Sequence, residues 1–392
     1  MSLVFDFFHS SSSSEEEEEV DVGERGYRMF HEALSLDERK RASDRNCVVS
    51  TARQTHTDGF KGICKIGDRI CTIQSHPKVG YGIVVLDKNQ LIKSKRRLAS
   101  ECASDTSLDH MKREKREPKG LVAINDSVTY FTCMKKGSKV HTLHCMIREE
   151  GKTKRITTVP WPEKYAKAKS SPRYVCYHEK SGYVYAICGN GMIFRTRVKS
   201  SSIEYFGRTG HGGARNLCFG LGTSTNFLIV TGKNYVSVFD TLHAKSTHNK
   251  PIYFQYFQKV SRDRSLFRSK PFTNDFWFEK AGTKFRKVCM IDGTMIVLHS
   301  YGICVVQHDF IESHKNNSYE FRKVNRAEHR IFANLSGQDP HDFVPIHINR
   351  DEGTATLAVT VTGKNEIHVI DVDLFVVVDD DDDDDDDGSS SV

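Results

Sequence analysis

The fold is decided by one stretch that occurs twice, as TGKNYVSVFD at residues 231–240 and as TGKNEIHVID at residues 362–371. Both copies read T-G-K-N-x-[VI]-x-V-[FI]-D, and the stretch GIVVLD at residues 82–87 ends in the same way. In each, a turn leads into a strand with apolar alternate residues that closes on a hydrophobic residue and Asp. An apolar partner precedes each full copy, at residues 228–230 and 357–359. The pattern predicts repeated β-hairpins.

An opening strand with its own repeated pattern lies further upstream of each hairpin. Residues 61–64, 173–176, 215–218 and 286–289 share a basic residue, an apolar residue and Cys in register. Looser equivalents occur at residues 120–123 and 343–346. Three or four strands in every 40 to 50 or so residues is the spacing of a propeller blade.

The sequence therefore predicts an all-β fold, a single β-propeller of six or seven blades spanning residues 56–375. The long gap between the opening strands at residues 214 and 285 leaves room for a seventh blade. The candidate strands in this gap are residues 252–257 and 276–278.

The closing V-x-V-[FIL]-D resembles the end of the third strand in WD-repeat propellers, where Trp-Asp closes the strand. The resemblance covers most of residues 56–375 and implies a propeller that binds other proteins. Trp is absent from every closing pair here, and the single Gly-His pair, Gly210-His211, is not in register with the repeats. A kelch-type or other divergent propeller stays open.

Closure of the ring often needs a strand from one terminus to complete a blade begun at the other. The apolar residues 3–8 supply either such a strand or a short docking peptide for a partner. Residues 1–26 are read as this apolar segment followed by a disordered Ser/Glu tract, and residues 376–392 as a disordered poly-Asp tail. Residues 27–55 are read as one short helix and a linker, packed on the propeller edge or binding a partner.

Charge is distributed unevenly along the chain. The whole chain carries +6, residues 1–25 carry −7, and the run of nine aspartates at 379–387 carries −9, so the body between them carries 6 + 7 + 9, or +22. Such a body attracts anionic partners through its long-range field. The acidic ends either keep the protein soluble or screen the basic body from within.

Eleven cysteines occur without any C-x-x-C pair, and no apolar run reaches the roughly 18 residues of a membrane span. These features predict reduced thiols in a nuclear or cytoplasmic protein that is not secreted and does not enter a membrane.

The sequence lacks the common phosphate-binding and catalytic motifs. The chain contains no phosphate-binding G-x-x-x-x-G-K-[ST], no G-x-S-x-G and no H-E-x-x-H, and Gly232 is better explained as a hairpin turn. In the densest His/Cys cluster, His141 and Cys145 face one side of a strand and His144 faces the other, so the three do not converge on a metal. We expect no catalytic residue, cofactor or metal.

Basic clusters in the connectors are the best candidates for binding residues. Two of them flank a Ser-containing loop and predict either an anion-binding surface or a nuclear import signal. Their members are Lys93, Lys95, Arg96, Arg97, Lys112, Arg113, Lys115 and Arg116. A third cluster, residues 152–155, lies between the second and third units.

A regular β-repeat without a catalytic set favours a non-enzymatic scaffold or adaptor subunit that holds protein partners on its faces and loops. The +22 body favours, as an alternative, a nucleic-acid- or chromatin-associated factor whose acidic tails screen its basic surface. A second alternative is a substrate-recognition subunit of a ubiquitin ligase.

Overall fold

The structure is a computed structural model that describes most of the chain between residues 59 and 374. The described residues are 59–76, 80–98, 106–108, 116–135, 137, 140–149, 152–165, 170–233, 235–245, 247–256, 285–299, 302–306, 309–313, 318–322, 329–335, 339–361 and 366–374. The predictions made for residues 1–26, 27–55 and 376–392 lie outside them, and so does the candidate closing strand at residues 3–8.

Most described residues form six four-stranded antiparallel sheets. From the innermost strand outwards, the first three sheets are β1 (Gly59–Ile66), β2 (Arg69–His76), β3 (Gly80–Asp87) and β5 (Thr106–Ser107); β6 (Arg116–Asn125), β7 (Val128–Lys135), β8 (His141–Glu149) and β9 (Lys152–Thr158); and β10 (Pro172–His178), β11 (Tyr183–Cys188), β12 (Met192–Arg197) and β13 (Glu204–Arg208).

The other three sheets follow the same plan, except that the last strand of the sixth comes from early in the chain. They are β14 (Ala214–Phe219), β15 (Phe227–Gly232), β16 (Tyr235–Asp240) and β17 (Tyr253–Tyr256); β18 (Phe285–Ile291), β19 (Thr294–His299), β20 (Gly302–Val306) and β23 (His329–Asn334); and β24 (Pro340–Asn349), β25 (Thr354–Val361), β26 (Glu366–Asp373) and β4 (Arg96–Leu98).

The remaining elements are connections. They are the helix α3 (Lys88–Ser94), the separate hairpin of β21 (Asp309–Ser313) and β22 (Ser318–Arg322), and the 3-10 turns η2 (Glu163–Tyr165) and η3 (Gly222–Ser224).

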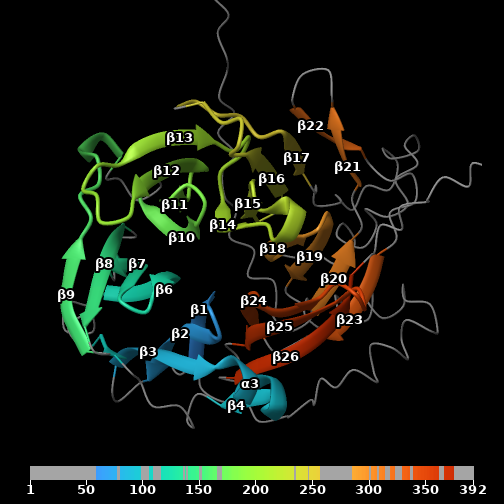
Figure 1. Cartoon of the computed structure of the whole chain (residues 1–392). Coiled ribbons are helices and arrows are strands. Elements are labelled where there is room, and N and C mark those ends of the chain that lie inside the picture. The colour runs from blue at the N-terminus through green and yellow to red at the C-terminus, as the bar shows by residue number, and fades with distance from the viewer. Residues whose placement is uncertain are drawn as a thin grey trace, which may run out of the picture.

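The sheets stand around one axis, with the six innermost strands in contact in a closed circle (Figure 1). The order of contact is β1, β6, β10, β14, β18, β24 and again β1. Since every innermost strand has a neighbour on both sides, the six described sheets close the ring, which is the architecture of a β-propeller. The predicted all-β propeller is confirmed.

The candidates for a seventh blade do not enter this circle in the described part of the chain. Residues 253–256 of the first candidate form β17, the outermost strand of the fourth sheet. Residues 276–278 lie outside the described residues.

Apolar side chains fill the space between neighbouring sheets. Ile73 and Ile83 of the first sheet pack with Leu121 and Phe131 of the second, and all four are at most 5% exposed. Equivalent clusters join the other neighbouring sheets. Full burial of such a side chain contributes roughly 1.5–3 kcal/mol, so the stacking of sheets supplies the core that one sheet lacks.

The repeated stretches form the predicted second and third strands. Gly232 ends β15, and a Cβ on it would lie 2.0 Å from Cε1 of Tyr235, the first residue of β16. The hairpin therefore needs glycine at this position. Residues 362–365 of the second copy lie outside the described residues, but β25 and β26 flank them as predicted.

The aspartate that closes the third strand has a structural task in each of these sheets. Asp87 accepts a hydrogen bond from the backbone N of Gln90 at 2.8 Å and caps α3. Asp240 accepts one from the backbone N of Leu242 at 2.8 Å, and Asp371 accepts one from Oγ1 of Thr356 at 2.8 Å. Asp87 and Asp240 thus bind backbone N–H groups just beyond the strand end, whereas Asp371 lies two residues before the end of β26 and binds a side chain of the adjacent strand β25.

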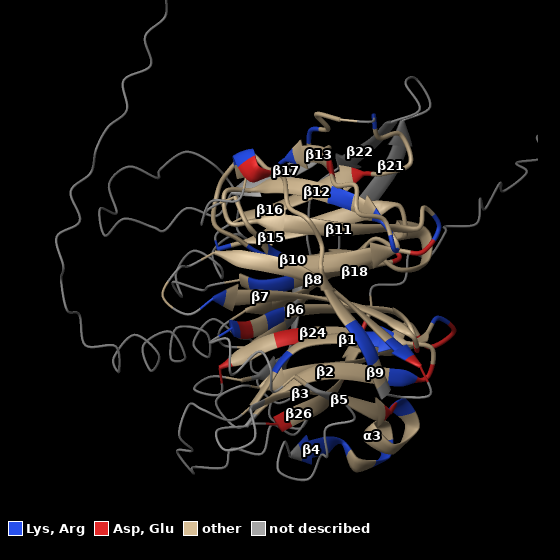
Figure 2. Cartoon of the chain, turned by 90° about the vertical axis from the view of Figure 1, so that its left-hand side faces the viewer, with Lys and Arg blue, Asp and Glu red and all other residues tan. Residues whose placement is uncertain are grey.

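Ring closure uses a strand from the first connector. β4 pairs antiparallel with β26, which joins residues 96–98 to residues 366–368. α3 precedes β4 and buries Leu91 among side chains of the first and sixth sheets. We call α3 and β4 together the clasp (Figures 1 and 2).

No helix of the described residues is long and apolar enough to cross a membrane.

Candidate anion-binding site

A β-bulge interrupts each of the six innermost strands near its start. The pairing with the second strand of the same sheet skips at least one residue between Phe60 and Ile63, Pro118 and Leu121, Pro172 and Tyr174, Ala214 and Asn216, Phe285 and Lys287, and Pro340 and Asp342. A bulge leaves its extra residue outside the ladder and re-aims the side chain.

Each bulge carries one Lys, Arg or His. These residues are Lys61, Lys119, Arg173, Arg215, Arg286 and His341, which we call the basic ring. All six are half-buried. Because each lies near the start of an innermost strand, the closed circle of strands brings all six to one end of the propeller axis.

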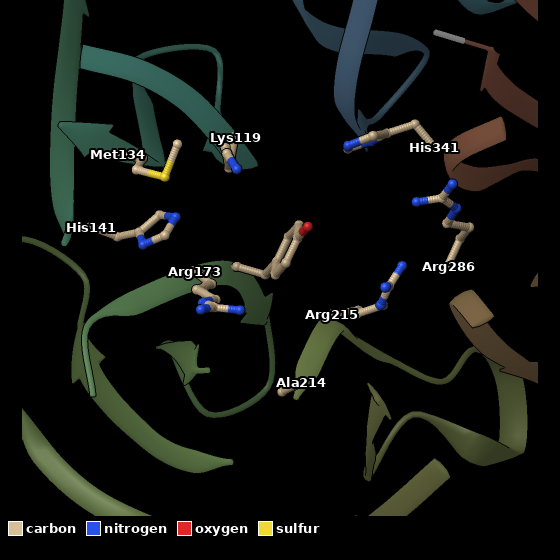
Figure 3. Close-up of a pocket in the computed structure, with 9 residues that line it drawn as sticks. Lys119, Met134, His141, Arg173, Ala214, Arg215, Arg286 and His341 are labelled. Atoms are coloured by element: carbon tan, nitrogen blue, oxygen red, sulfur yellow. The ribbon is translucent and has the colours of Figure 1, made fainter. Parts of the chain in front are cut away.

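A cavity of about 350 Å³ opens inside the basic ring. Its lining comes from the five sheets that follow the first, and Figure 3 shows basic side chains entering it from several directions. The lining residues are Lys119, Met134, His141, Arg173, Tyr174, Ala214, Arg215, Arg286 and His341. A volume near the lower end of the range for ligand pockets suits a compact chemical group.

Two carboxylates occupy part of the ring. Glu117 binds the ammonium of Lys61, and Asp339 accepts a hydrogen bond from Nη2 of Arg286 at 2.6 Å. Both carboxylates are partly exposed, so these pairs are screened by solvent. Within the described residues, Lys119, Arg173 and Arg215 have no hydrogen-bonded carboxylate.

Neighbouring members of the ring act on one another electrostatically. Burial lowers the pKa of Lys119, and the charges of Lys61 and Arg173 lower it further, against an opposing effect of Glu117. Burial likewise lowers the pKa of Arg215, helped by Arg286 and Arg173. Burial and the neighbouring positive charges thus disfavour the cationic forms, and a bound anion would favour them.

His341 completes the circle as a neutral group at pH 7. Burial lowers its pKa, with further lowering by Arg286 and Lys61, while Asp342 and Asp339 act in the opposite direction. The ring therefore carries five positive charges against the two of Glu117 and Asp339.

Arg173 is held in place from two sides. Oγ1 of Thr132, which is fully buried, donates a hydrogen bond to the carbonyl oxygen of Arg173 at 2.6 Å and joins the second sheet to the third. The guanidinium lies against Gly189, where a Cβ would be 2.6 Å from both Cζ and Nε of Arg173. The position of this side chain thus depends on a residue with no side chain.

A buried ion pair and its hydrogen bonds link four sheets. Nζ of Lys287 donates to Oδ1 of Asp342 at 2.8 Å, and both side chains are less than a tenth exposed. Asp342 also accepts from the backbone N of Ile63 at 3.3 Å and from Nδ2 of Asn216 at 3.4 Å. Burial opposes the charge of Lys287, but Asp342 outweighs it and raises the pKa of Lys287.

The first predicted basic cluster lies in the clasp, not in a loop. Lys93 is in α3, Arg96 and Arg97 are in β4, and Lys95 between them binds Oδ2 of Asp371 at 2.9 Å. Nη1 of Arg96 lies 3.9 Å from Oε1 of Glu366. Figure 2 shows Lys and Arg on both α3 and β4 beside β26. These acidic partners neutralise part of the positive charge of this cluster.

Of the second predicted cluster, Lys112, Arg113 and Lys115 lie outside the described residues. Arg116 begins β6, where its Nη1 donates to Oγ1 of Thr142 at 3.3 Å. The third cluster, residues 152–155, belongs to β9, the outer strand of the second sheet. The assignment of these basic residues to connectors is therefore wrong for β4, β6 and β9. Their binding role stays a prediction.

His141, His144 and Cys145 lie in β8 as predicted, and the ring of His144 stacks on Phe131 with centroids 5.3 Å apart. His141 lines the cavity. The cysteines of the opening strands behave as buried apolar residues at Cys64, Cys176 and Cys289, whereas Cys218 is half-buried.

The repeated pattern that predicts the opening strands also contains the residues of the basic ring. Lys61, Arg173, Arg215 and Arg286 open the repeated basic–x–apolar–Cys pattern, and Lys119 and His341 stand at the same register. In a regular strand, parity alone would decide towards which of the two neighbouring sheets these residues point. The bulges that decide their direction depend on pairing between strands, which the pattern does not encode.

No protein-family model matches the chain, and no curated protein matches it. The β-propeller domain of Cps50 (Swd1) from Myceliophteria thermophila is similar to this chain with a TM-score of 0.46, at 11% identity over 82% of this chain and 98% of that one.

A protein of unknown function from Bacteroides thetaiotaomicron has a TM-score of 0.44, at 12% identity over 82% of this chain and 71% of that one. The Dos1 propeller has a TM-score of 0.40, at 8% identity over 81% and 68%. At this level of similarity we draw nothing from these proteins, and the propeller is assigned from the closed ring of sheets.

Proposed function

We propose that this protein is a non-enzymatic protein-interaction scaffold that receives an acidic segment of a partner protein at the basic ring. One observation carries the proposal: six bulges, one in each sheet, bring six basic residues to one end of the axis. A repeated distortion that re-aims basic side chains supports a binding site more than chance surface charge does.

The excess of positive charge at the basic ring favours a negatively charged segment of the partner. Five cations and two carboxylates leave a net charge of 5 − 2, or +3, around the cavity. Charge of one sign within a concave site concentrates field lines and speeds the approach of an oppositely charged group. The +22 body supports the same preference at longer range.

The test compares partners captured from the native cell by three forms of the full chain. They are the unchanged protein, the double variant Arg173→Glu/Arg215→Glu, and Arg350→Glu, whose side chain is 62% exposed. We expect a set of proteins with acidic or phosphorylated segments to be lost from the double variant and kept by the control. Identical partner sets from all three forms would overturn the proposal.

The same experiment addresses the narrower predictions. Ubiquitin-ligase components among the lost partners would identify a substrate-recognition subunit, which is one kind of scaffold. The fraction of the cell from which partners are recovered tests the predicted nuclear or cytoplasmic location.

A further inference from the structure

Within the described part of the chain, three cations of the basic ring have no carboxylate bound to them. Glu117 pairs with Lys61 and Asp339 pairs with Arg286, which leaves Lys119, Arg173 and Arg215, on three consecutive sheets, lining the cavity. Figure 3 shows the labelled side chains of these residues on different sides of the pocket, with an aromatic side chain among them.

Three side-chain nitrogens at this site are buried and have no hydrogen-bond partner in the described part of the chain, and two of them, on arginines, are donors. Among the described residues, Nε of Arg173, Nε of Arg286 and Nδ1 of His341 are shielded from solvent and make no hydrogen bond. Buried polar groups are ordinarily paired, and exceptions cluster where a ligand or ordered water supplies the partner. The site therefore lacks acceptors in number, and it lacks them on several sides at once.

We propose that the group bound at the basic ring is a phosphomonoester, held chiefly by Lys119, Arg173 and Arg215. This inference rests on the proposed function and adds the chemical class of the ligand. The phosphate is carried by a side chain of the partner protein or by a small free molecule.

Charge and geometry favour phosphate over carboxylate. A carboxylate brings one negative charge and two oxygens in one plane, whereas a phosphomonoester brings about −1.5 to −2 charges and three acceptor oxygens. Three cations that approach from three sheets match three oxygens directed apart. Guanidinium forks pair with phosphate through two parallel hydrogen bonds, and the cavity holds two such groups besides Arg286.

The experiment uses the full chain and fluorescein-labelled heptapeptides of glycine and serine. The central residue is phosphoserine, aspartate or serine, and binding is followed by fluorescence anisotropy. We expect the phosphoserine peptide to bind at least tenfold more tightly than the aspartate peptide. Arg173→Gln and Arg215→Gln should each weaken it at least tenfold, and Arg350→Gln should leave it unchanged.

The thermal unfolding temperature of each variant shows whether a loss of binding comes from a loss of folded structure. If either arginine variant unfolds at a lower temperature, Lys119→Gln serves in its place, because its side chain lies on another sheet. Glycerol 2-phosphate, a small phosphomonoester whose binding to the protein is measured directly by isothermal titration calorimetry, identifies the source of the phosphate.

The outcomes separate this inference from the proposed function. Equal affinity for the phosphoserine and aspartate peptides, lost in the arginine variants, overturns the phosphate inference and leaves the scaffold intact. Saturable binding of glycerol 2-phosphate but of no peptide, again lost in the variants, supports phosphate from a small free molecule and counts against the acidic protein segment. Binding of no phosphate probe, or equal binding by the variants, overturns the inference.

Discussion

At the scale of single residues, the candidate site depends on glycine as much as on arginine. Gly189 leaves room for the guanidinium of Arg173, whose Cζ would lie 2.6 Å from a Cβ at that position. Such a distance is far below van der Waals contact, so any side chain here must displace the guanidinium or the backbone.

Gly189→Ala should therefore weaken binding of the phosphoserine peptide about tenfold while leaving the fold intact. The matched control is Gly212→Ala, where the nearest atom to a Cβ is the carbonyl oxygen of Gly189 at 3.6 Å, an ordinary contact. Anisotropy titrations and urea unfolding of both variants check the prediction. Unchanged binding by Gly189→Ala would show that Arg173 is not positioned by this contact.

A second residue-scale prediction concerns His299, which is 2% exposed. Burial lowers its pKa to about 3, so the native protein keeps the imidazole neutral while the unfolded chain takes up a proton below pH 6.5 or so. Stability from this residue is complete above that pH and is lost as the pH falls towards 3. Between pH 7.5 and 5.5 we expect a loss of about 1 kcal/mol.

Urea unfolding at the two pH values measures this loss, with His299→Phe as the comparison. The variant should lose about 1 kcal/mol less than the unchanged protein over the same interval. The same pH dependence in both proteins would contradict the assignment.

At the scale of elements, the hairpins were predictable and the clasp was not. The stretch from Tyr235 to Asp240 alternates, carries its own turn and forms β16 as predicted. β4 has three residues and no apolar alternation, and it becomes a strand only because β26 offers an open edge. The same basic residues look like a loop in the sequence because an acidic partner such as Asp371 lies 276 residues after Lys95.

Leu91 makes the clasp testable. Its side chain is 2% exposed and packs between the first and sixth sheets. Leu91→Ala should lower the free energy of unfolding by about 2–4 kcal/mol through lost burial and a cavity. It should also speed amide exchange at Val369, whose N donates to the carbonyl oxygen of Lys95 at 2.9 Å.

Leu242→Ala is the control, because Leu242 is 59% exposed. It should change the free energy of unfolding by less than about 0.5 kcal/mol. Similar losses in the two variants would mean that the clasp adds little to stability.

At the scale of the whole molecule, the ring architecture was predictable because each unit repeats the same strand order. The site was not, because it is assembled from residues such as Lys119 and Arg215, which are distant in sequence and meet only after closure. No local sequence pattern predicts which strands will have their first residues close together at the axis.

Charge distribution gives the prediction at this scale. Deletion of residues 376–392 removes nine aspartates and changes the net charge from +6 to 6 + 9, or +15. If the acidic tail screens the basic body, the truncated chain should bind a double-stranded DNA oligonucleotide more tightly, with an affinity that falls steeply between about 50 and about 200 mM salt. Anisotropy titrations across that range measure both effects. Unchanged affinity, or a flat response to salt, would count against the nucleic-acid alternative.

The pairing of residues 96–98 with residues 366–368 also sets the order of assembly. During translation residues 96–98 stay unpaired until residues 366–368 have left the ribosome. The last blade is then completed by a contact of very high sequence separation, which carries a large loop-closure penalty and slows folding. A chain truncated before residue 366 would lack β26, so β4 would have no partner strand and the hydrophobic side chains that pack against Ile367, Ile370 and Val372 would be uncovered and prone to aggregation.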